Sequence, residues 1–341
     1  MADATMPGQA RATPDAVLDV RDLCLEFPVY KGSVKALNGV SLRVGPGEIV
    51  GVVGESGSGK SVTAMAALRL LPPGGFTVTG GTLTLLGRDV LAATEKDMRA
   101  VRGRDAAMIF QEPLTALNPT KRIGAQLADV ILCHQNLTKT QVRDKAVALL
   151  RDMYISDPEQ ILRRYPFELS GGMRQRVMIA LAFSCDPRLL IADEPTTALD
   201  VTVQRQVLLL LQEKARERGT AVLFITHDMA VVSQFCDRVY VMYAGSVVEQ
   251  GNTREVMARP RHPYTRGLLQ GLPENAPPAT VLPSIRGQVP DMAALPRGCA
   301  FRDRCDHADD ACAVRPALRS LDGDAARKAA CWHVLVEEPA P

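Results

Sequence analysis

The hydrophobic pattern of the chain switches repeatedly between strand-like runs and helix-like periodicity. Residues 17–25 alternate apolar and charged positions, as a half-buried strand does. A further apolar run, residues 49–53, predicts another strand. Continuous apolar runs, which are typical of strands covered on both faces of a parallel sheet, occupy residues 189–192 and 221–225. Between the last two runs, Val203, Val207 and Leu211 form a helical stripe. Strands that alternate with helices predict a doubly wound α/β core.

A helix-rich stretch interrupts this core pattern. Residues 111–165 carry two apolar helical faces, one marked by Ile123 and Leu127 and the other by Val142 and Leu149. Residues 171–185 predict one more helix. We therefore expect a helical subdomain at about residues 112–185.

The chain changes character near its two ends. Residues 1–16 contain no apolar run, so we expect a flexible N-terminus there, followed by a main domain over residues 17–258. Residues 273–300 are rich in proline, which indicates an extended linker. The C-terminal extension, residues 259–341, is predicted to be small and irregular and to be joined to the main domain through this linker.

Composition narrows the classes of function. The chain has 341 residues, 46% of them hydrophobic, which is enough for a packed core. Its net charge of +2 provides no bulk attraction to nucleic acid or to an anionic membrane surface, and we expect no nucleic-acid partner. Its apolar runs fall well short of the roughly 20 residues that a membrane-spanning helix needs. We expect a soluble chain without a signal peptide.

The strongest chemical signal is the stretch Gly54–Ser61, which reads GESGSGKS between an apolar run and a helical segment. It matches the phosphate-binding P-loop, G-x-x-x-x-G-K-[ST]. The glycines let backbone N–H groups point at phosphates, while Lys60 can reach the β- and γ-phosphates and Ser61 can bind Mg²⁺. We predict ATP and Mg²⁺ as cofactors. The predicted nucleotide-binding residues are Ser56, Gly57, Ser58, Gly59, Lys60, Ser61 and Val62.

Two further patterns are typical of phosphate chemistry. Asp193 ends an apolar run where it can hold Mg²⁺, and Glu194 is placed to orient or deprotonate an attacking water. Ser170 has the chemistry of a helix N-cap, and Gly171 and Gly172 leave that helix N-terminus open to an anion. One domain cannot easily aim two phosphate-binding devices at one nucleotide, so we expect two chains to pair head to tail.

The order of these motifs resembles the ATPase subunits of ABC transporters. Residues 169–176, LSGGMRQR, resemble the signature motif that contacts ATP bound to a partner's P-loop. The resemblance implies a P-loop NTPase core with an antiparallel β subdomain and a helical subdomain. It also implies that Gln111 senses Mg²⁺ and water, that His227 contacts the γ-phosphate, and that Asp200 belongs to the D-loop.

The same resemblance implies an aromatic side chain that stacks on adenine. Tyr30 is the best match, because it lies shortly before the first strands of the domain. Phe27 competes for this role, and a core position is the alternative for either aromatic.

Two stretches resemble the dipeptide, oligopeptide and nickel importers, and their D-type member in particular. These are residues 111–119 and residues 261–269, which contain the sequence HPYT. The resemblance implies a subunit that hydrolyses ATP to power import of di- or oligopeptides, at the cytoplasmic face of the inner membrane. The implied partners are an F-type ABC ATPase subunit, two transmembrane permease subunits and an extracytoplasmic solute-binding protein. The solute itself is left open.

A soluble ABC ATPase that acts on DNA or ribosomes is the main alternative. Such proteins fuse two ATPase modules or insert a long coiled coil. This chain has one module, no sustained heptad repeat and no block of basic residues. The importer subunit is therefore the favoured interpretation.

The C-terminal extension contains half of the eight cysteines. Four thiolates can hold an iron–sulfur cluster or zinc, and their spacing leaves both open, together with free thiols. The importer resemblance implies a [4Fe–4S] cluster. Charged residues separate the cysteines, so we expect the bound group to supply order, independently of the nucleotide site. The predicted ligands are Cys299, Cys305, Cys312 and Cys331. The cysteines predicted to lie in the core are Cys24, Cys133, Cys185 and Cys236.

Overall fold

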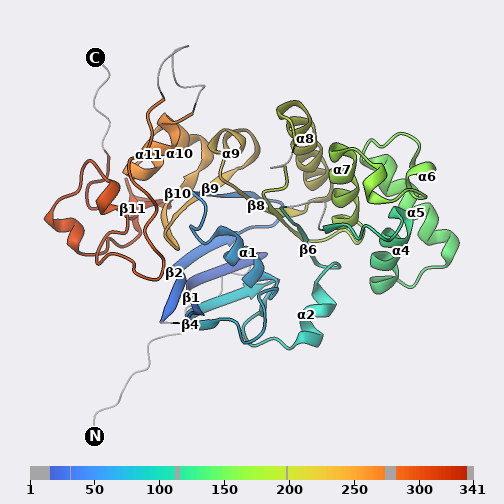
Figure 1. Ribbon diagram of the computed structural model, residues 1–341, viewed down its shortest axis with the longest axis horizontal. Coiled ribbons are helices and arrows are strands. Elements are labelled where there is room, and N and C mark those ends of the chain that lie inside the picture. The colour runs from blue at the N-terminus through green and yellow to red at the C-terminus, as the bar shows by residue number, and fades with distance from the viewer. Residues whose placement is uncertain (1–15, 31, 112–115, 197–198, 273–281, 336–341) are drawn as a thin grey trace, which may run out of the picture.

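The structure is a computed structural model that describes residues 16–30, 32–111, 116–196, 199–272 and 282–335. Nearly all of the predicted flexible N-terminus therefore lies outside the described residues, as does part of the stretch 111–119. The described strands form two sheets (Figure 1).

The smaller sheet is the expected antiparallel β subdomain. Its order is β2 (Ser33–Val44), β1 (Leu18–Pro28), β4 (Thr77–Leu85) and β5 (Arg88–Asp89). Leu18 pairs with Val44 on one side and with Leu85 on the other, and all three side chains are buried. The predicted alternation in residues 17–25 is confirmed, because β1 buries every second side chain over most of its length.

The larger sheet forms the α/β core. In the described residues its order is β11 (Arg319–Leu321), β12 (Asp324–Ala329), β10 (Ser246–Asn252), β9 (Arg238–Tyr243), β3 (Ile49–Val53), β8 (Ala221–Thr226), β7 (Leu189–Asp193) and β6 (Ala106–Ile109). The strands from β9 to β6 run parallel, and β10 runs antiparallel to β9. Every residue of β7 and β8 is buried, which confirms the prediction from their continuous apolar runs. The strand predicted at residues 49–53 is β3, and it is buried throughout.

Alternate side chains of the central strands enter two different cores. Val50 and Val52 face a core shared with the smaller sheet and α1 (Lys60–Ala67). Ile49 and Val53 face a core built with α7 (Gly171–Ala182), α8 (Val201–Arg218) and α9 (Met229–Phe235). Successive side chains of a strand point to opposite faces, and both faces of β3 are apolar because a core covers each of them. The P-loop, which follows β3, lies between these two layers.

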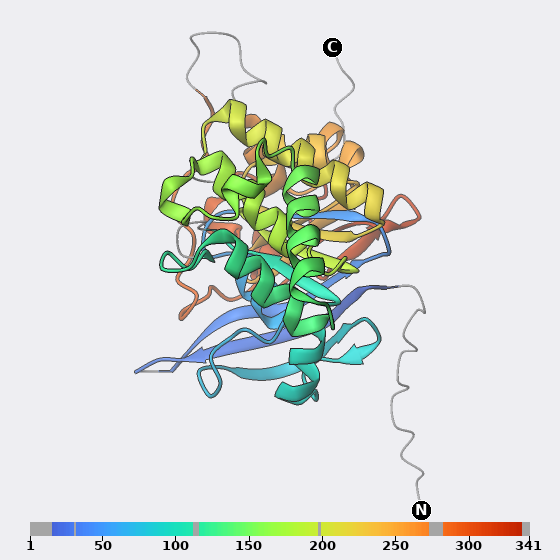
Figure 2. The same cartoon turned by 90° about the vertical axis from the view of Figure 1, so that its right-hand side faces the viewer.

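The predicted helical region contains α4 (Ile123–His134), α5 (Lys139–Asp152), α6 (Pro158–Ile161) and α7 (Figure 2). Ile123 and Leu127 of α4 are buried, as are Val142 and Leu149 of α5, so both predicted faces are confirmed. The prediction that Cys133 lies in the core is wrong, because this residue is exposed on α4 outside the buried stripe. Of the other three, Cys236 is buried and Cys24 and Cys185 are half-buried.

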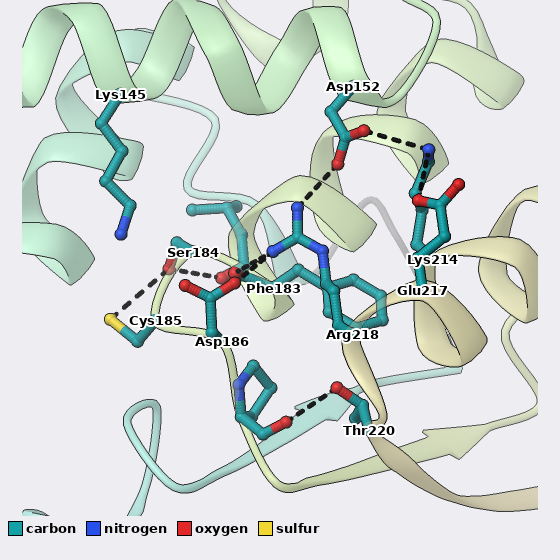
Figure 3. Close-up of polar contacts among 12 residues, drawn as sticks. Lys145, Asp152, Phe183, Ser184, Cys185, Asp186, Lys214, Glu217, Arg218 and Thr220 are labelled. Atoms are coloured by element: carbon teal, nitrogen blue, oxygen red, sulfur yellow. Dashed lines mark hydrogen bonds and ion pairs between the residues drawn. The ribbon is translucent and has the colours of Figure 1, made fainter. Parts of the chain in front are cut away.

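A network of charges joins this helical region to α8 (Figure 3). Arg218, the last residue of α8, pairs with Asp152 at 2.6 Å and with Asp186, and its guanidinium lies 5.2 Å from the centre of the Phe183 ring. Lys214 pairs with Asp152 at 3.0 Å. Burial disfavours the charge of Lys214, but hydrogen bonds to acidic partners raise its pKa above the ordinary lysine value. The end of α5 is thus tied to the core through ion pairs as well as apolar packing.

The C-terminal extension is less irregular and less separate than predicted. Its strand β12 pairs with β10, with Glu249 opposite Ala329, and so extends the main sheet. A two-residue turn joins β11 to β12, and both turn residues, Asp322 and Gly323, have positive φ angles. Such an Asp-Gly turn favours a hairpin, but the strands beside it are short and polar and therefore lack a hydrophobic signal. In Figure 1 this segment (red) lies at the β10 end of the molecule, away from the helical region (green).

The described helices contain no segment that is both long and apolar enough to cross a membrane. The described residues also form α2 (Glu95–Val101), α10 (Thr253–Ala258) and α11 (Pro263–Gln270). They include three short 3₁₀ turns as well: η1 (Pro166–Glu168), and, in the C-terminal extension, η3 (Arg302–Arg304) and η4 (Asp310–Ala313). The sequence HPYT begins α11, where Pro263 is the first helical residue and the His262 side chain accepts a hydrogen bond from the Tyr264 N–H.

Candidate functional site

The P-loop links β3 to α1 with a backbone that two glycines make possible. Gly54 has a φ angle of 157°, and a Cβ there would lie 2.1 Å from the Met242 carbonyl oxygen. Gly59 has a φ angle of 98°, and its Cβ would lie 2.8 Å from the Ala36 carbonyl oxygen. A side chain at either position would therefore displace β9 or β2. Ser56 and Gly57 are exposed at the tip of the loop, Ser58 and Gly59 are buried, and Val62 is half-buried within α1.

Lys60 lies inside the loop and is only 5% exposed. Its ammonium group donates hydrogen bonds to the carbonyl oxygens of Gly54, at 2.7 Å, and Glu55, at 2.9 Å. Burial lowers the pKa of Lys60, while the nearby carboxylates of Glu194, Asp193 and Glu55 oppose this shift. The loop thus curls around a buried cation, as binding of an anionic phosphate requires.

The predicted Mg²⁺ ligands Ser61 and Asp193 are in contact. The Ser61 hydroxyl donates a hydrogen bond of 3.1 Å to the Asp193 carboxylate, although the two residues are 132 positions apart. Burial raises the pKa of Asp193, and the Glu194 charge raises it further. A cation at this oxygen pair would stabilise the ionised carboxylate, and hard oxygen ligands are those that Mg²⁺ prefers.

The three predicted catalytic residues also meet, with Glu194 in the middle. The Gln111 amide donates to Glu194 Oε2 at 3.1 Å, and His227 Nδ1 lies 3.2 Å from Glu194 Oε1. Gln111 follows β6, Glu194 follows β7 and His227 follows β8, so three neighbouring parallel strands present them at one edge of the sheet. Gln111 therefore contacts the Glu194 carboxylate here rather than the Ser61–Asp193 pair.

Glu194 has an unusual backbone that the sequence did not indicate. Its φ angle is 44°, in the left-handed region, and its N–H donates to the Ile225 carbonyl oxygen at 2.9 Å. Non-glycine residues adopt this region at a cost, and they do so more often at functional sites. The bend turns the Glu194 side chain toward both Gln111 and His227.

The signature residues lie on a different part of the molecule. Ser170 is the exposed N-cap of α7 and accepts a hydrogen bond from the Met173 N–H. A Cβ at Gly172 would lie 2.8 Å from the Val203 side chain, so close packing of α7 on α8 requires this glycine. Asp200 is the N-cap of α8 and accepts from the Val203 N–H. Ala198 of the predicted D-loop lies outside the described residues.

The two candidates for adenine stacking differ in exposure. Tyr30 is 99% exposed and lies two residues after the end of β1. Phe27 is part of β1 and packs against the core shared by the smaller sheet and α1. An exposed ring is free to stack on a base, which favours Tyr30 over Phe27.

The four C-terminal cysteines line one small pocket, together with His262, Phe301 and His333. Burial raises the pKa values of Cys299 and Cys305, and it raises that of Cys331 to about 11. Asp309, Cys312 and His333 also offer ligand atoms that all lie within 4.8 Å of one another. The structure therefore brings the predicted ligands together around one pocket.

Sequence reasoning missed a contact between this cysteine segment and the P-loop. Arg304, from the turn η3 between Cys299 and Cys305, forms an ion pair of 2.7 Å with Glu55. The Glu55 N–H donates to the Tyr264 hydroxyl of α11 at 2.9 Å. The expected structural separation of the two segments is wrong, because Arg304 contacts Glu55. The separation of 249 residues between these two positions hides the contact from any local pattern.

Comparison with known proteins agrees with this architecture. Residues 37–197 match the ABC transporter family, and residues 248–312 match the C-terminal region of oligopeptide and dipeptide transporters. A structure of cbiO1 from Clostridium perfringens, described as part of the ABC transporter complex cbiONQ, is similar with a TM-score of 0.61 and 27% identity, covering 72% of this chain and 91% of that one. The dimeric post-hydrolysis structure of the ATP-binding cassette MJ0796, bound to ADP and Pi, shares the fold with a TM-score of 0.61 and 24% identity, covering 70% and 99%.

Curated relatives match over nearly their whole length. The probable D,D-dipeptide transport ATP-binding protein DdpD of Escherichia coli is 62% identical over 317 residues, covering 93% of this chain and 96% of the relative. The oligopeptide transport ATP-binding protein OppD of the same organism is 44% identical and covers 98% of both chains. The chain therefore belongs to the ATP-binding proteins of ABC transporters and is an ATPase. Within that family it belongs to the oligopeptide and dipeptide transport branch.

Proposed function

We propose that this chain hydrolyses ATP to power import of di- or oligopeptides. The observation that carries the proposal is the contact of Glu194 with both Gln111 and His227, beside a P-loop whose Ser61 contacts Asp193. The 62% identical relative is named for transport of D,D-dipeptides, which makes short peptides the first solutes to test.

Each residue of the site has a proposed task. The backbone of residues 56–61 and the Lys60 ammonium bind the β- and γ-phosphates, and Tyr30 stacks on adenine. Ser61 and Asp193 would hold Mg²⁺, which neutralises phosphate charge in this chemistry. Glu194 orients or deprotonates the attacking water. Gln111 and His227 hold that carboxylate from two sides, at 3.1 and 3.2 Å, so that it acts in one orientation.

We propose a head-to-tail dimer with an F-type ABC ATPase subunit. Ser170, Gly171 and Gly172 lie at the start of α7, where Ser170 is exposed, Gly171 faces Leu199 and Gly172 faces Val203 of α8. In such a dimer, the N-terminus of α7 and Asp200 face ATP on the partner's P-loop. Ser170 supplies a hydroxyl there, and the helix N-terminus favours an anion.

A groove beside the Gln111 strand is the proposed docking surface for the permease subunits. It has a volume of about 350 Å³ and is lined largely by apolar side chains, among them Phe110, Leu117 and Met178. Phe110 is 44% exposed, directly before Gln111. A short apolar helix of a permease would cover this patch and place the chain at the cytoplasmic face of the inner membrane. The solute-binding protein would act on the other side of that membrane.

The test is to purify the chain from membranes of the cells that naturally produce it, and to identify the proteins that copurify. We expect a second ABC ATPase and two permeases to copurify, and we expect short peptides with the cognate binding protein to stimulate hydrolysis. A Ser170→Arg variant should retain nucleotide binding to this chain and lose the stimulated activity. Stimulation by nickel but not by peptides would overturn the peptide assignment, and hydrolysis by an isolated monomer at the full rate would overturn the dimer.

We also propose that Cys299, Cys305, Cys312 and Cys331 hold a [4Fe–4S] cluster. Their position around one pocket supports this, because thiolates are the usual ligands of such clusters. All four thiols would lose their protons on binding, and the bound cluster would supply order to this segment.

Protein purified without oxygen should accordingly be brown. The Cys305→Ser variant should lose the colour and become sensitive to proteolysis at residues 297–335. The control variant Cys133→Ser, at an exposed position on α4, should keep the brown colour and resist proteolysis there. Iron and sulfide analysis with visible absorbance measures the outcome. Colourless protein with one zinc per chain would instead assign the site to a zinc ion, for which Asp309, Cys312 and His333 are the close group.

A further inference from the structure

Arg304 is buried against the P-loop, unlike the exposed residues beside it in the turn η3. It is 6% exposed, and its guanidinium donates to both carboxylate oxygens of Glu55, at 2.7 and 3.0 Å. Its Nε donates to the Arg286 carbonyl oxygen at 2.9 Å. Arg302, in the same turn, is 41% exposed and pairs only loosely with Asp303, at 3.5 Å. The C-terminal extension therefore aims one arginine of this turn at the P-loop.

Glu55 belongs to the loop that surrounds the phosphate site. Its carbonyl oxygen accepts from Lys60, and its N–H donates to Tyr264. Its carboxylate charge also acts on Lys60. An unpaired carboxylate here would repel the phosphates of ATP and compete with them for the Lys60 charge. Pairing with an arginine removes that repulsion, and the two parallel hydrogen bonds hold the carboxylate in one place.

An aromatic cluster holds Arg304 against the loop. The rings of Tyr243, Tyr264 and Phe301 have centres 4.7 to 5.4 Å apart. The guanidinium lies 5.8 Å from the Tyr243 ring centre and 5.9 Å from that of Phe301. These rings come from β9, α11 and the cysteine segment, so they join the ATPase core to the extension.

We propose that Arg304 is a positioning residue of the ATP site, which neutralises Glu55 and thereby couples the cysteine segment to ATP affinity. The inference rests on the proposed assignment of residues 54–61 as the ATP phosphate loop. Cys299 and Cys305 flank the turn that carries Arg304, and the Cys299 N–H donates to the Cys312 carbonyl oxygen at 2.9 Å. A change that releases the cysteine pocket also withdraws Arg304, and ATP affinity falls with it.

The test compares ATP affinity in purified full-length variants, by equilibrium titration with a fluorescent ATP analogue. Arg304→Gln leaves Glu55 unpaired, and we expect affinity to fall about tenfold, as loss of a charge-assisted pair predicts. Arg302→Gln is the matched control and should stay within about twofold of the unmodified chain. The double variant Arg304→Gln with Glu55→Gln should recover most of the affinity, because the repelling charge is gone. Cys305→Ser should weaken binding and Cys133→Ser should not.

Several outcomes would overturn the inference. A lower melting temperature of Arg304→Gln with ATP affinity within about twofold of the unmodified chain is the signature of a purely structural pair and contradicts the inference. A double variant weaker than Arg304→Gln alone would exclude charge neutralisation as the mechanism. If Arg304→Gln does not fold, Glu55→Gln alone decides: it should bind ATP at least as tightly as the unmodified chain, and weaker binding contradicts the proposal. Failure of the unmodified chain to bind ATP would instead contradict the loop assignment.

Discussion

Replacement of Glu194 by glutamine is expected to reduce ATP hydrolysis by roughly 10²–10⁴-fold, the range that general-base catalysis contributes. The amide keeps the size of the side chain and a contact with Gln111, but it cannot accept a proton from water. Nucleotide binding should be retained, because Lys60 and Ser61 are unchanged and lie on another segment. Phosphate release under multiple turnover, with nucleotide affinity measured in parallel, checks both expectations.

Glu217→Gln provides the matched control, since Glu217 lies on α8 and pairs with Lys214 outside the site. It should hydrolyse ATP at the normal rate. Hydrolysis by the Glu194→Gln variant within about threefold of the unmodified chain would remove Glu194 from the catalytic role. Loss of nucleotide binding by the same variant would indicate that Glu194 supports the loop rather than the reaction.

Lys60→Ala is expected to weaken ATP binding by about ten- to hundredfold, because hydrogen bonds to a charged group contribute about 1.5–3 kcal/mol. The substitution removes the buried cation and leaves the Gly54 and Glu55 carbonyl oxygens without its hydrogen bonds. Titration with a fluorescent ATP analogue measures the affinity. The rise in melting temperature on adding ATP should disappear at concentrations that saturate the unmodified chain.

Lys121→Ala is a suitable comparison, because Lys121 is half exposed and pairs with Asp129 on the surface. It should leave both affinity and the nucleotide-dependent stabilisation unchanged. Equal ATP affinity of Lys60→Ala and the unmodified chain would contradict the assignment of residues 54–61 as the phosphate loop.

Local sequence patterns were sufficient to predict most of the fold and to identify the motifs. The apolar runs at residues 189–192 and 221–225 predicted two buried parallel strands, because a strand covered on both faces is apolar at every position. The P-loop was recognisable from eight consecutive residues, since a loop that wraps phosphate needs glycine and lysine at fixed spacing. Glu194 was predicted from its position at the end of an apolar run, and the role of His227 was implied by the resemblance to ABC transporter ATPases.

Contacts between distant segments were decided by the tertiary structure alone. The positive φ angle of Glu194 depends on the bond of its N–H to Ile225, in the next strand of the sheet. Gly172 is required by the approach of Val203 on another helix. Arg304 reads in the sequence as one more charge among cysteines, yet it is buried against Glu55, which precedes it by 249 residues. The position of a charged residue in the sequence does not indicate its ion-pair partner. Only packing of the C-terminal extension on the core brings Arg304 and Glu55 together.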